Sequence, residues 1–183
     1  SRLDDGIALA AVAGGFPVGD DDPSAVSESI RVAVKAGADE IDCVLEPRDA
    51  EDFPREPELA MLLAMREASA GCALKVIIET PLLGERSMRA VVRMALAAGA
   101  EFVKSCTGKR GGCSDEAAGI LAFEVMRHGV TMGDRRGVKL SGGIGTKSDV
   151  ERLLGVLHSE DSTIEGPARL RIGASTLLDD LVD

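Results

Sequence analysis

Gly37-Ala38-Asp39-Glu40-Ile41-Asp42 and Gly99-Ala100-Glu101-Phe102-Val103-Lys104 are two copies of one pattern. In each copy, a Gly-Ala pair of the kind that ends a helix precedes a short apolar strand. A charged residue then stands at the same position of each strand. The pattern predicts a helix–strand unit that occurs more than once along the chain.

The rest of the chain continues this alternation of strands and helices. Near-continuous apolar runs, typical of parallel strands covered on both faces, are Ile7–Ala13, Glu40–Leu45, Leu74–Glu79, Glu101–Cys106, Gly137–Ser141 and Leu170–Gly173. Helical apolar stripes lie between them, carried by Val26, Ile30 and Val34, by Met88, Val91, Val92 and Ala95, and by Val150, Leu153, Leu154 and Leu157. Pro23 suits a first helical turn, and Thr146 with Asp149 suits a helix start.

Repeated strand–helix units predict an α/β fold with a parallel sheet. Their spacing matches the roughly 31 residues per unit of a (β/α)8 TIM barrel. Six units use up the 183 residues. We therefore expect one domain over residues 1–183 that carries the third to eighth βα units and lacks the first two. The loosest stretches are residues 110–112 and 133–136.

Composition limits the classes of partner. The formal net charge is −10, which disfavours nucleic acid and anionic membranes as partners. Any phosphate must therefore be held by local donors. The four cysteines show no CxxC pairing, which indicates a reducing, cytoplasmic location. The two histidines have no partner at metal-ligand spacing, so we do not expect a zinc site. We also expect no cofactor.

Three predicted strands carry an ionisable residue inside an apolar run: Asp42, Lys104 and Lys139. In an α/β barrel the chemistry lies at the C-terminal ends of the strands. A second ammonium group and burial lower the pKa of a lysine, and a neutral lysine attacks carbonyl groups to form an iminium. Asp42 is placed to move protons. The structural alternative is an Asp–Lys ion pair with a spare lysine that reaches solvent. Lys75 and Glu79 share one strand face, where we expect a supporting ion pair.

Glycine-rich turns follow the last two predicted strands. Gly142 and Gly143 follow one strand, and Gly173 with Ser175 follows the other and opens a helix. Glycines let the backbone approach an anion, and helix N-termini offer free N–H donors. In phosphate-using barrels such loops follow strands seven and eight. Gly108 and Lys109, after the Lys104 strand, add a third edge and a positive charge.

Together these residues resemble the deoxyribose-phosphate aldolase family. The matching segments, in family order, are residues 15–19 (GFPVG), 37–42 (GADEID), 74–80 (LKVIIET), 102–109 (FVKSCTGK), 137–144 (GVKLSGGI) and 171–175 (RIGAS). The resemblance implies a class I aldolase without a metal that interconverts 2-deoxy-D-ribose 5-phosphate with D-glyceraldehyde 3-phosphate and acetaldehyde. It implies that Lys104 forms the imine, that Lys139 tunes the pKa of Lys104, that Asp42 and Lys139 relay protons, and that the glycine turns hold the phosphate.

The chain departs from the family pattern at several points. Gly145 stands where the family commonly has Arg, Cys106 replaces a usual Ser, and the chain has no C-terminal Tyr. Two other functions therefore stay open: a non-catalytic barrel-derived domain that binds a sugar phosphate or a partner chain, and a related Schiff-base aldolase with another aldehyde. Six strands leave two open sheet edges, which also suggest a homo-oligomer.

Overall fold

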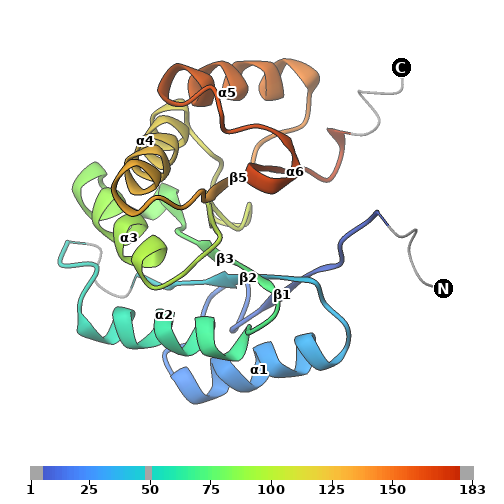
Figure 1. Ribbon diagram of the computed structural model, residues 1–183, viewed down its shortest axis with the longest axis vertical. Coiled ribbons are helices and arrows are strands. Elements are labelled where there is room, and N and C mark those ends of the chain that lie inside the picture. Colours follow the sequence, from blue (N-terminus) through green and yellow to red (C-terminus); the bar gives the residue numbers. More distant parts are fainter. Residues whose placement is uncertain (1–5, 48–50, 178–183) are drawn as a thin grey trace.

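Six parallel strands form one sheet in the computed structural model, which describes residues 6–47 and 51–177. The strands follow one another across the sheet in chain order, and every neighbouring pair is parallel. They are β1 (Ala10–Ala13), β2 (Glu40–Val44), β3 (Ala73–Ile77), β4 (Phe102–Lys104), β5 (Gly137–Ser141) and β6 (Leu170–Gly173). The sheet curls into a half-barrel (Figure 1). The predicted α/β class is confirmed.

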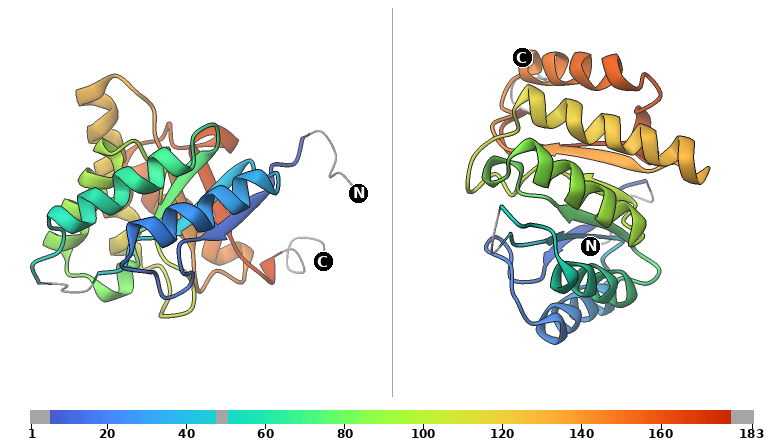
Figure 2. Two further views of the ribbon diagram at one scale, coloured as in Figure 1. Left: turned by 90° about the horizontal axis from the view of Figure 1, so that it is seen from below. Right: turned by 90° about the vertical axis from the view of Figure 1, so that its left-hand side faces the viewer.

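Five longer helices form the outer layer of this half-barrel. They are α1 (Pro23–Lys35), α2 (Glu56–Ala68), α3 (Glu85–Ala97), α4 (Asp115–Met132) and α5 (Lys147–Glu160), with a 3-10 turn η1 (Thr80–Leu82) and a short α6 (Gly166–Arg169) before β6. The five pack side by side in chain order, as the views from two further sides agree (Figure 2). Buried aliphatic side chains such as Ile41, Val91 and Leu121 fill the space between helices and sheet.

The predicted helix signals are present. Pro23 occupies the first turn of α1, and Thr146 and Asp149 form a reciprocal capping box at the start of α5. The expected stripe of α3 is buried. No single apolar stripe marks α2 or α4 in the sequence, because α2 exposes apolar Leu59 and Leu63 on its outer face and α4 is apolar on most sides.

Four strands are shorter than predicted, the second by one residue only, since it ends at Val44 instead of Leu45. The first begins at Ala10 instead of Ile7, and the Ile7 and Leu9 side chains are exposed, so burial does not extend the strand. The third ends at Ile77, because Glu79 adopts a left-handed backbone conformation (φ 56°) ahead of the 3-10 turn. The fourth ends at Lys104, ahead of the turn at Gly108.

Both outer edges of the sheet are open within residues 6–47 and 51–177. There, β1 pairs with β2 alone and β6 with β5 alone. Val12 of β1 is 52% exposed beside the first open edge. The prediction that residues 1–183 form one domain with the third to eighth βα units of a barrel, without the first two, stays a prediction. Among the described helices, none combines the length and the apolar character needed to cross a membrane.

Candidate active site

Three lysines converge on the carboxylate of Asp42. Because Ile41 and Cys43 lie in the core under the helices, strand alternation turns Asp42 to the concave face of the sheet. There Asp42 Oδ1 accepts a hydrogen bond from Lys75 Nζ at 3.0 Å, while Oδ2 accepts from Lys104 Nζ at 2.9 Å and Lys139 Nζ at 2.6 Å. The alternative with one spare lysine in solvent is therefore wrong, because all three lysines contact the same carboxylate.

The strand register produces this convergence. Asp42 and Lys75 are register partners on β2 and β3, and Lys104 and Lys139 are partners on β4 and β5. Each pair therefore points to the same face from adjacent strands. The curl of the sheet then brings the two pairs together around one carboxylate.

A second carboxylate extends the cluster across the half-barrel. Glu40 Oε2 lies 2.6 Å from Lys75 Nζ, and Glu40 Oε1 accepts from Arg171 Nη2 at 2.7 Å. Glu40 is on β2 and Arg171 on β6, so this contact joins distant strands across the concave face. Two carboxylates thus face four cations, and the site is positive although the chain as a whole is negative.

Burial makes these charges interact strongly. Asp42 is 2% exposed and Lys104 is 6% exposed. Burial acts to raise the pKa of Asp42, but the ammonium groups of Lys104, Lys139 and Lys75 outweigh it and bring that pKa down to about 2. The pKa of Lys139 is lowered, first by burial and then by the neighbouring ammonium groups, although Asp42 opposes this. The pKa of Asp42 and the pKa of Lys139 are both lowered, because several cations share one anion.

The glycine turns meet beside this cluster. Gly108 and Gly142 are in contact, since a Cβ on Gly108 would lie 3.4 Å from Gly142 Cα. A Cβ on Gly145 would lie 3.5 Å from Thr176 Oγ1, and one on Gly173 would lie 3.4 Å from Lys139 Cε. The structure therefore brings together the loops that follow β4, β5 and β6, next to Lys139. The side chains of Lys109 and Ser175 belong to exposed residues of these loops.

The expected pair between Lys75 and Glu79 is wrong. Lys75 contacts Asp42 and Glu40 instead. The strand ends before Glu79, whose left-handed backbone turns its side chain away from the face of Lys75. The buried Glu79 carboxylate accepts from the Thr107 backbone N–H at 3.2 Å and from Arg110 at 3.4 Å.

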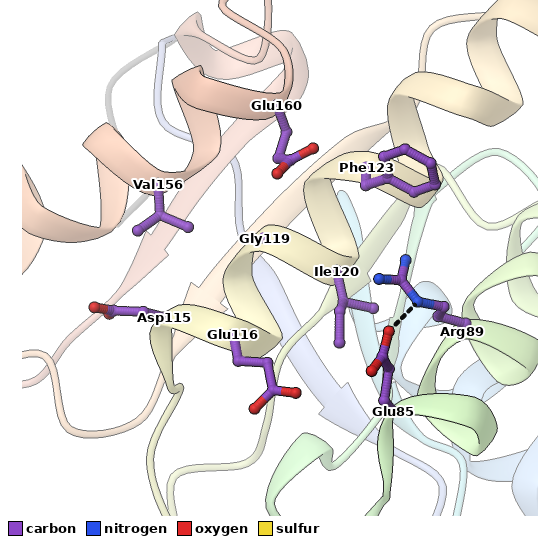
Figure 3. A pocket seen from close by; sticks show the side chains of 9 residues that line it. All are labelled: Glu85, Arg89, Asp115, Glu116, Gly119, Ile120, Phe123, Val156 and Glu160. Carbon is purple, nitrogen blue, oxygen red and sulfur yellow. Dashed lines mark hydrogen bonds and ion pairs between the residues drawn. The ribbon is translucent and has the colours of Figure 1, made fainter.

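A hollow of about 450 Å³ lies elsewhere, on the outer surface between α3, α4 and α5 (Figure 3). Four carboxylates line it, from Glu85, Asp115, Glu116 and Glu160, together with Arg89. Arg89 is paired with Glu85 at 2.8 Å. This excess of negative charge would repel a phosphate, so the hollow is a poor place for an anionic ligand.

No family model matches the chain, but curated relatives match most of it. Deoxyribose-phosphate aldolase 2 of Bacillus licheniformis is 38% identical over 141 residues, which are 76% of this chain and 60% of the relative. The deoxyribose-phosphate aldolase of Nocardia farcinica is 38% identical over 152 residues, which are 81% of this chain and 65% of the relative. This chain is a homologue of the deoxyribose-phosphate aldolases. It spans less than two thirds of the length of these aldolases.

Solved structures support the same fold. A structure described as a putative deoxyribose-phosphate aldolase from Toxoplasma gondii superposes with a TM-score of 0.85 at 20% identity, covering 97% of this chain and 69% of that one. The deoxyribose phosphate aldolase of Aeropyrum pernix, described as a tetramer, gives a TM-score of 0.77 at 26% identity and covers 97% and 68%. The half-barrel is thus part of the barrel fold of these aldolases.

Two of the departures from the aldolase pattern, Cys106 and Gly145, have different surroundings. The Cys106 thiol is buried and donates to the Ser141 carbonyl oxygen at 2.7 Å. Burial is the largest cause that raises its pKa, so the thiol stays protonated and is a poor nucleophile beside Lys104. Gly145 is partly exposed at the start of α5, where its N–H donates to Asp149 at 3.1 Å.

Sequence reasoning missed Glu40, Arg171 and Arg110 as members of the site region. A signal existed for Glu40, because it stands two residues before Asp42 and so shares its strand face. Arg171 is the register partner of Lys139. For Arg110 no local signal existed, since it lies in a glycine-rich stretch that the sequence marks as loose.

Proposed function

We propose that this chain provides the Schiff-base and phosphate-binding part of a class I deoxyribose-phosphate aldolase. The reaction is the interconversion of 2-deoxy-D-ribose 5-phosphate with D-glyceraldehyde 3-phosphate and acetaldehyde. The observation that carries the proposal is the contact of Lys104 and Lys139 with the same buried oxygen of Asp42. The homology to named aldolases supports the choice of substrate class.

In the proposed mechanism, Lys104 is the nucleophile. Its neutral Nζ attacks the aldehyde carbon of the substrate, the carbonyl oxygen leaves as water, and a cationic iminium remains on Nζ. The proton of the substrate's C3 hydroxyl passes to the relay of Lys139 and Asp42 as the C–C bond breaks. The iminium accepts the electron pair of that bond, which gives an enamine, and D-glyceraldehyde 3-phosphate leaves with a new C=O bond. Protonation of the enamine carbon and hydrolysis of the imine then release acetaldehyde and free Lys104.

Lys139 and Asp42 support these proton transfers. The lowered pKa of Lys139 makes its ammonium a better proton donor and its neutral form easier to reach. Asp42, with a pKa of about 2, remains a carboxylate and holds both lysines by charge. We infer that Asp42 mainly orients Lys104 and Lys139 and accepts protons only transiently. The tuning of Lys104 by Lys139 is part of this proposal.

The phosphate would lie on the three glycine loops. The candidates are Gly108 and Lys109 after β4, Gly142 and Gly143 after β5, and Gly173 and Ser175 after β6. Gly108, Gly142 and Gly143 have positive φ angles of 75°, 90° and 74°, which glycine adopts readily, and they carry no side chain that would cover the backbone. Backbone N–H groups there supply the local donors that an acidic protein needs for an anion.

We further propose a cytoplasmic protein that forms homo-oligomers. All four cysteines are free thiols, which suits a reducing compartment. The Aeropyrum pernix relative is described as tetrameric, and the open sheet edges offer surfaces for association.

Steady-state cleavage of 2-deoxyribose 5-phosphate tests the proposal. We expect turnover by the chain, loss of turnover in Lys104→Met, and unchanged turnover in Lys35→Met, a matched change at an exposed lysine on α1. The unphosphorylated sugar should show a higher KM, because it lacks the anion that the glycine loops would hold. Folded protein without turnover, or Lys104→Met with full turnover, would overturn the assignment.

A further inference from the structure

One guanidinium group connects the four loops that follow β1, β2, β3 and β4. Arg110 lies in the loop after β4. Its Nη1 and Nη2 donate to the two carboxylate oxygens of Glu46, after β2, at 3.0 and 2.7 Å. Nη2 also donates to the Pro17 carbonyl, after β1, at 3.2 Å and approaches Glu79, after β3, at 3.4 Å. A bidentate arginine–carboxylate pair fixes direction as well as distance.

The joined loops are in close contact around this guanidinium. A Cβ on Gly19 would lie 2.7 Å from Glu46 Cβ, and one on Gly111 would lie 2.8 Å from Pro81 Cβ. Gly15 and Gly19 also have positive φ angles of 73° and 91°. The 14–19 loop is therefore shaped to lie against its neighbours, and Arg110 holds two of its carbonyl groups, those of Pro17 and Val18.

The 14–19 loop carries one aromatic ring over the proposed nucleophile. The Phe16 ring centroid lies 5.9 Å from Lys104 Nζ, within the range of a cation–π interaction. An iminium on Lys104 keeps its positive charge at this same nitrogen. The ring would stabilise the ammonium of Lys104 and the iminium alike, so it favours the cationic intermediate over the neutral amine that attacks the aldehyde.

We propose that Arg110 is a positioning residue for imine formation, because it holds the 14–19 loop so that Phe16 stays over Lys104. The inference rests on the proposed Schiff-base function of Lys104. Arg110 does not itself contact the reacting atoms. It acts through the Pro17 and Val18 carbonyls, with Glu46 and Glu79 fixing the direction of its guanidinium.

The test combines borohydride trapping of acetaldehyde on Lys104 with hydrogen exchange of the 14–19 loop. The variants are Arg110→Gln, Phe16→Leu and the double variant, and Arg86→Gln is the control at an exposed arginine of α3. We expect Arg110→Gln to speed exchange in the loop and to slow trapping roughly tenfold, the scale of a shielded cation–π contact. Arg110→Lys should recover only part of the rate, since one ammonium cannot bind Glu46 in the bidentate manner.

The double variant decides whether Arg110 acts through Phe16. We expect it to trap no more slowly than Phe16→Leu alone. A rate equal to the product of the two single effects would overturn the inference, as would faster exchange in Arg110→Gln with unchanged trapping. If the unmodified chain traps no acetaldehyde, the Schiff-base function fails and this inference fails with it. If the unmodified chain and Arg110→Gln trap acetaldehyde at the same rate, the role of Arg110 fails and the Schiff-base function of Lys104 stands.

Discussion

Replacing Asp42 by asparagine removes the negative charge that three buried lysines share. The asparagine side chain would keep the size of the aspartate and one carbonyl acceptor. It would leave Lys75, Lys104 and Lys139 facing one another across a neutral amide. We therefore expect Asp42→Asn to fold with a lower free energy of unfolding and to lose Schiff-base activity.

The pKa of Asp42 sets the size of this loss. It falls from the ordinary value of 3.8 to about 2 in the folded protein. A difference of that size corresponds to about 2 kcal/mol of stabilisation of the carboxylate. Removing one partner of a buried ion pair typically costs about 3–5 kcal/mol, because charges are left without compensation. The expected loss near neutral pH is therefore at least about 2 kcal/mol.

The stabilisation by the Asp42 carboxylate should disappear in acid. The folded pKa lies below the ordinary one, so the carboxylate stabilises the fold fully above 3.8 and stops doing so as the pH falls through about 2. Urea unfolding of both proteins over this range measures the difference directly. Asp52→Asn, at an exposed aspartate, is the control. An effect of Asp42→Asn no larger than that of the control, or one that does not shrink in acid, would refute the electrostatic reasoning.

Three further experiments test the surroundings of the lysine cluster. Lys139→Met should lower the free energy of unfolding in urea, because Asp42 loses its partner at 2.6 Å, and it should slow trapping of acetaldehyde, because Lys139 is the proposed proton donor; unchanged stability or unchanged trapping would contradict this. Gly142→Ala should lower the free energy of unfolding in urea by about 2 kcal/mol or more, since the φ of Gly142 is 90° and a Cβ there would overlap Cys106 Sγ. Gly145→Ala should lower it by less than about 0.5 kcal/mol. Iodoacetamide should modify the partly exposed Cys113 before the buried Cys106. The reaction should be slow, because burial raises the pKa of Cys113 to about 11. Mass spectrometry of peptides measures the order of modification, and modification of Cys106 first would contradict this prediction.

The sequence predicted the strands and the central lysines because both leave local signals. An ionisable residue inside an apolar run is costly to bury, so Asp42, Lys104 and Lys139 stand out from their neighbours. Strand order and parallel direction follow from repeated strand–helix units. The register that pairs Lys104 with Lys139 then follows from equivalent positions in successive units.

Contacts across the half-barrel could not be predicted in this way. Glu40 and Arg171 are 131 residues apart, and they meet only because the sheet curls. Charges at strand ends are ordinary, so Arg171 carries no local signal, and the signal for Glu40 is only its place two residues before Asp42 on the same strand face. The role of Arg110 could not be predicted for the same reason, since its partners Glu46 and Pro17 come from other loops. The error at Glu79 arose because strand alternation was extended past a left-handed residue.

Borohydride reduction in the presence of acetaldehyde, followed by mass spectrometry of peptides, identifies the lysine that forms the imine. We expect an N-ethyl group on Lys104 and none on Lys104→Met. Lys75 and Lys139, which contact the same carboxylate, should remain unmodified. An adduct on Lys75 or Lys139 in place of Lys104, or no adduct on folded protein, would contradict the role of Lys104 as the Schiff-base lysine.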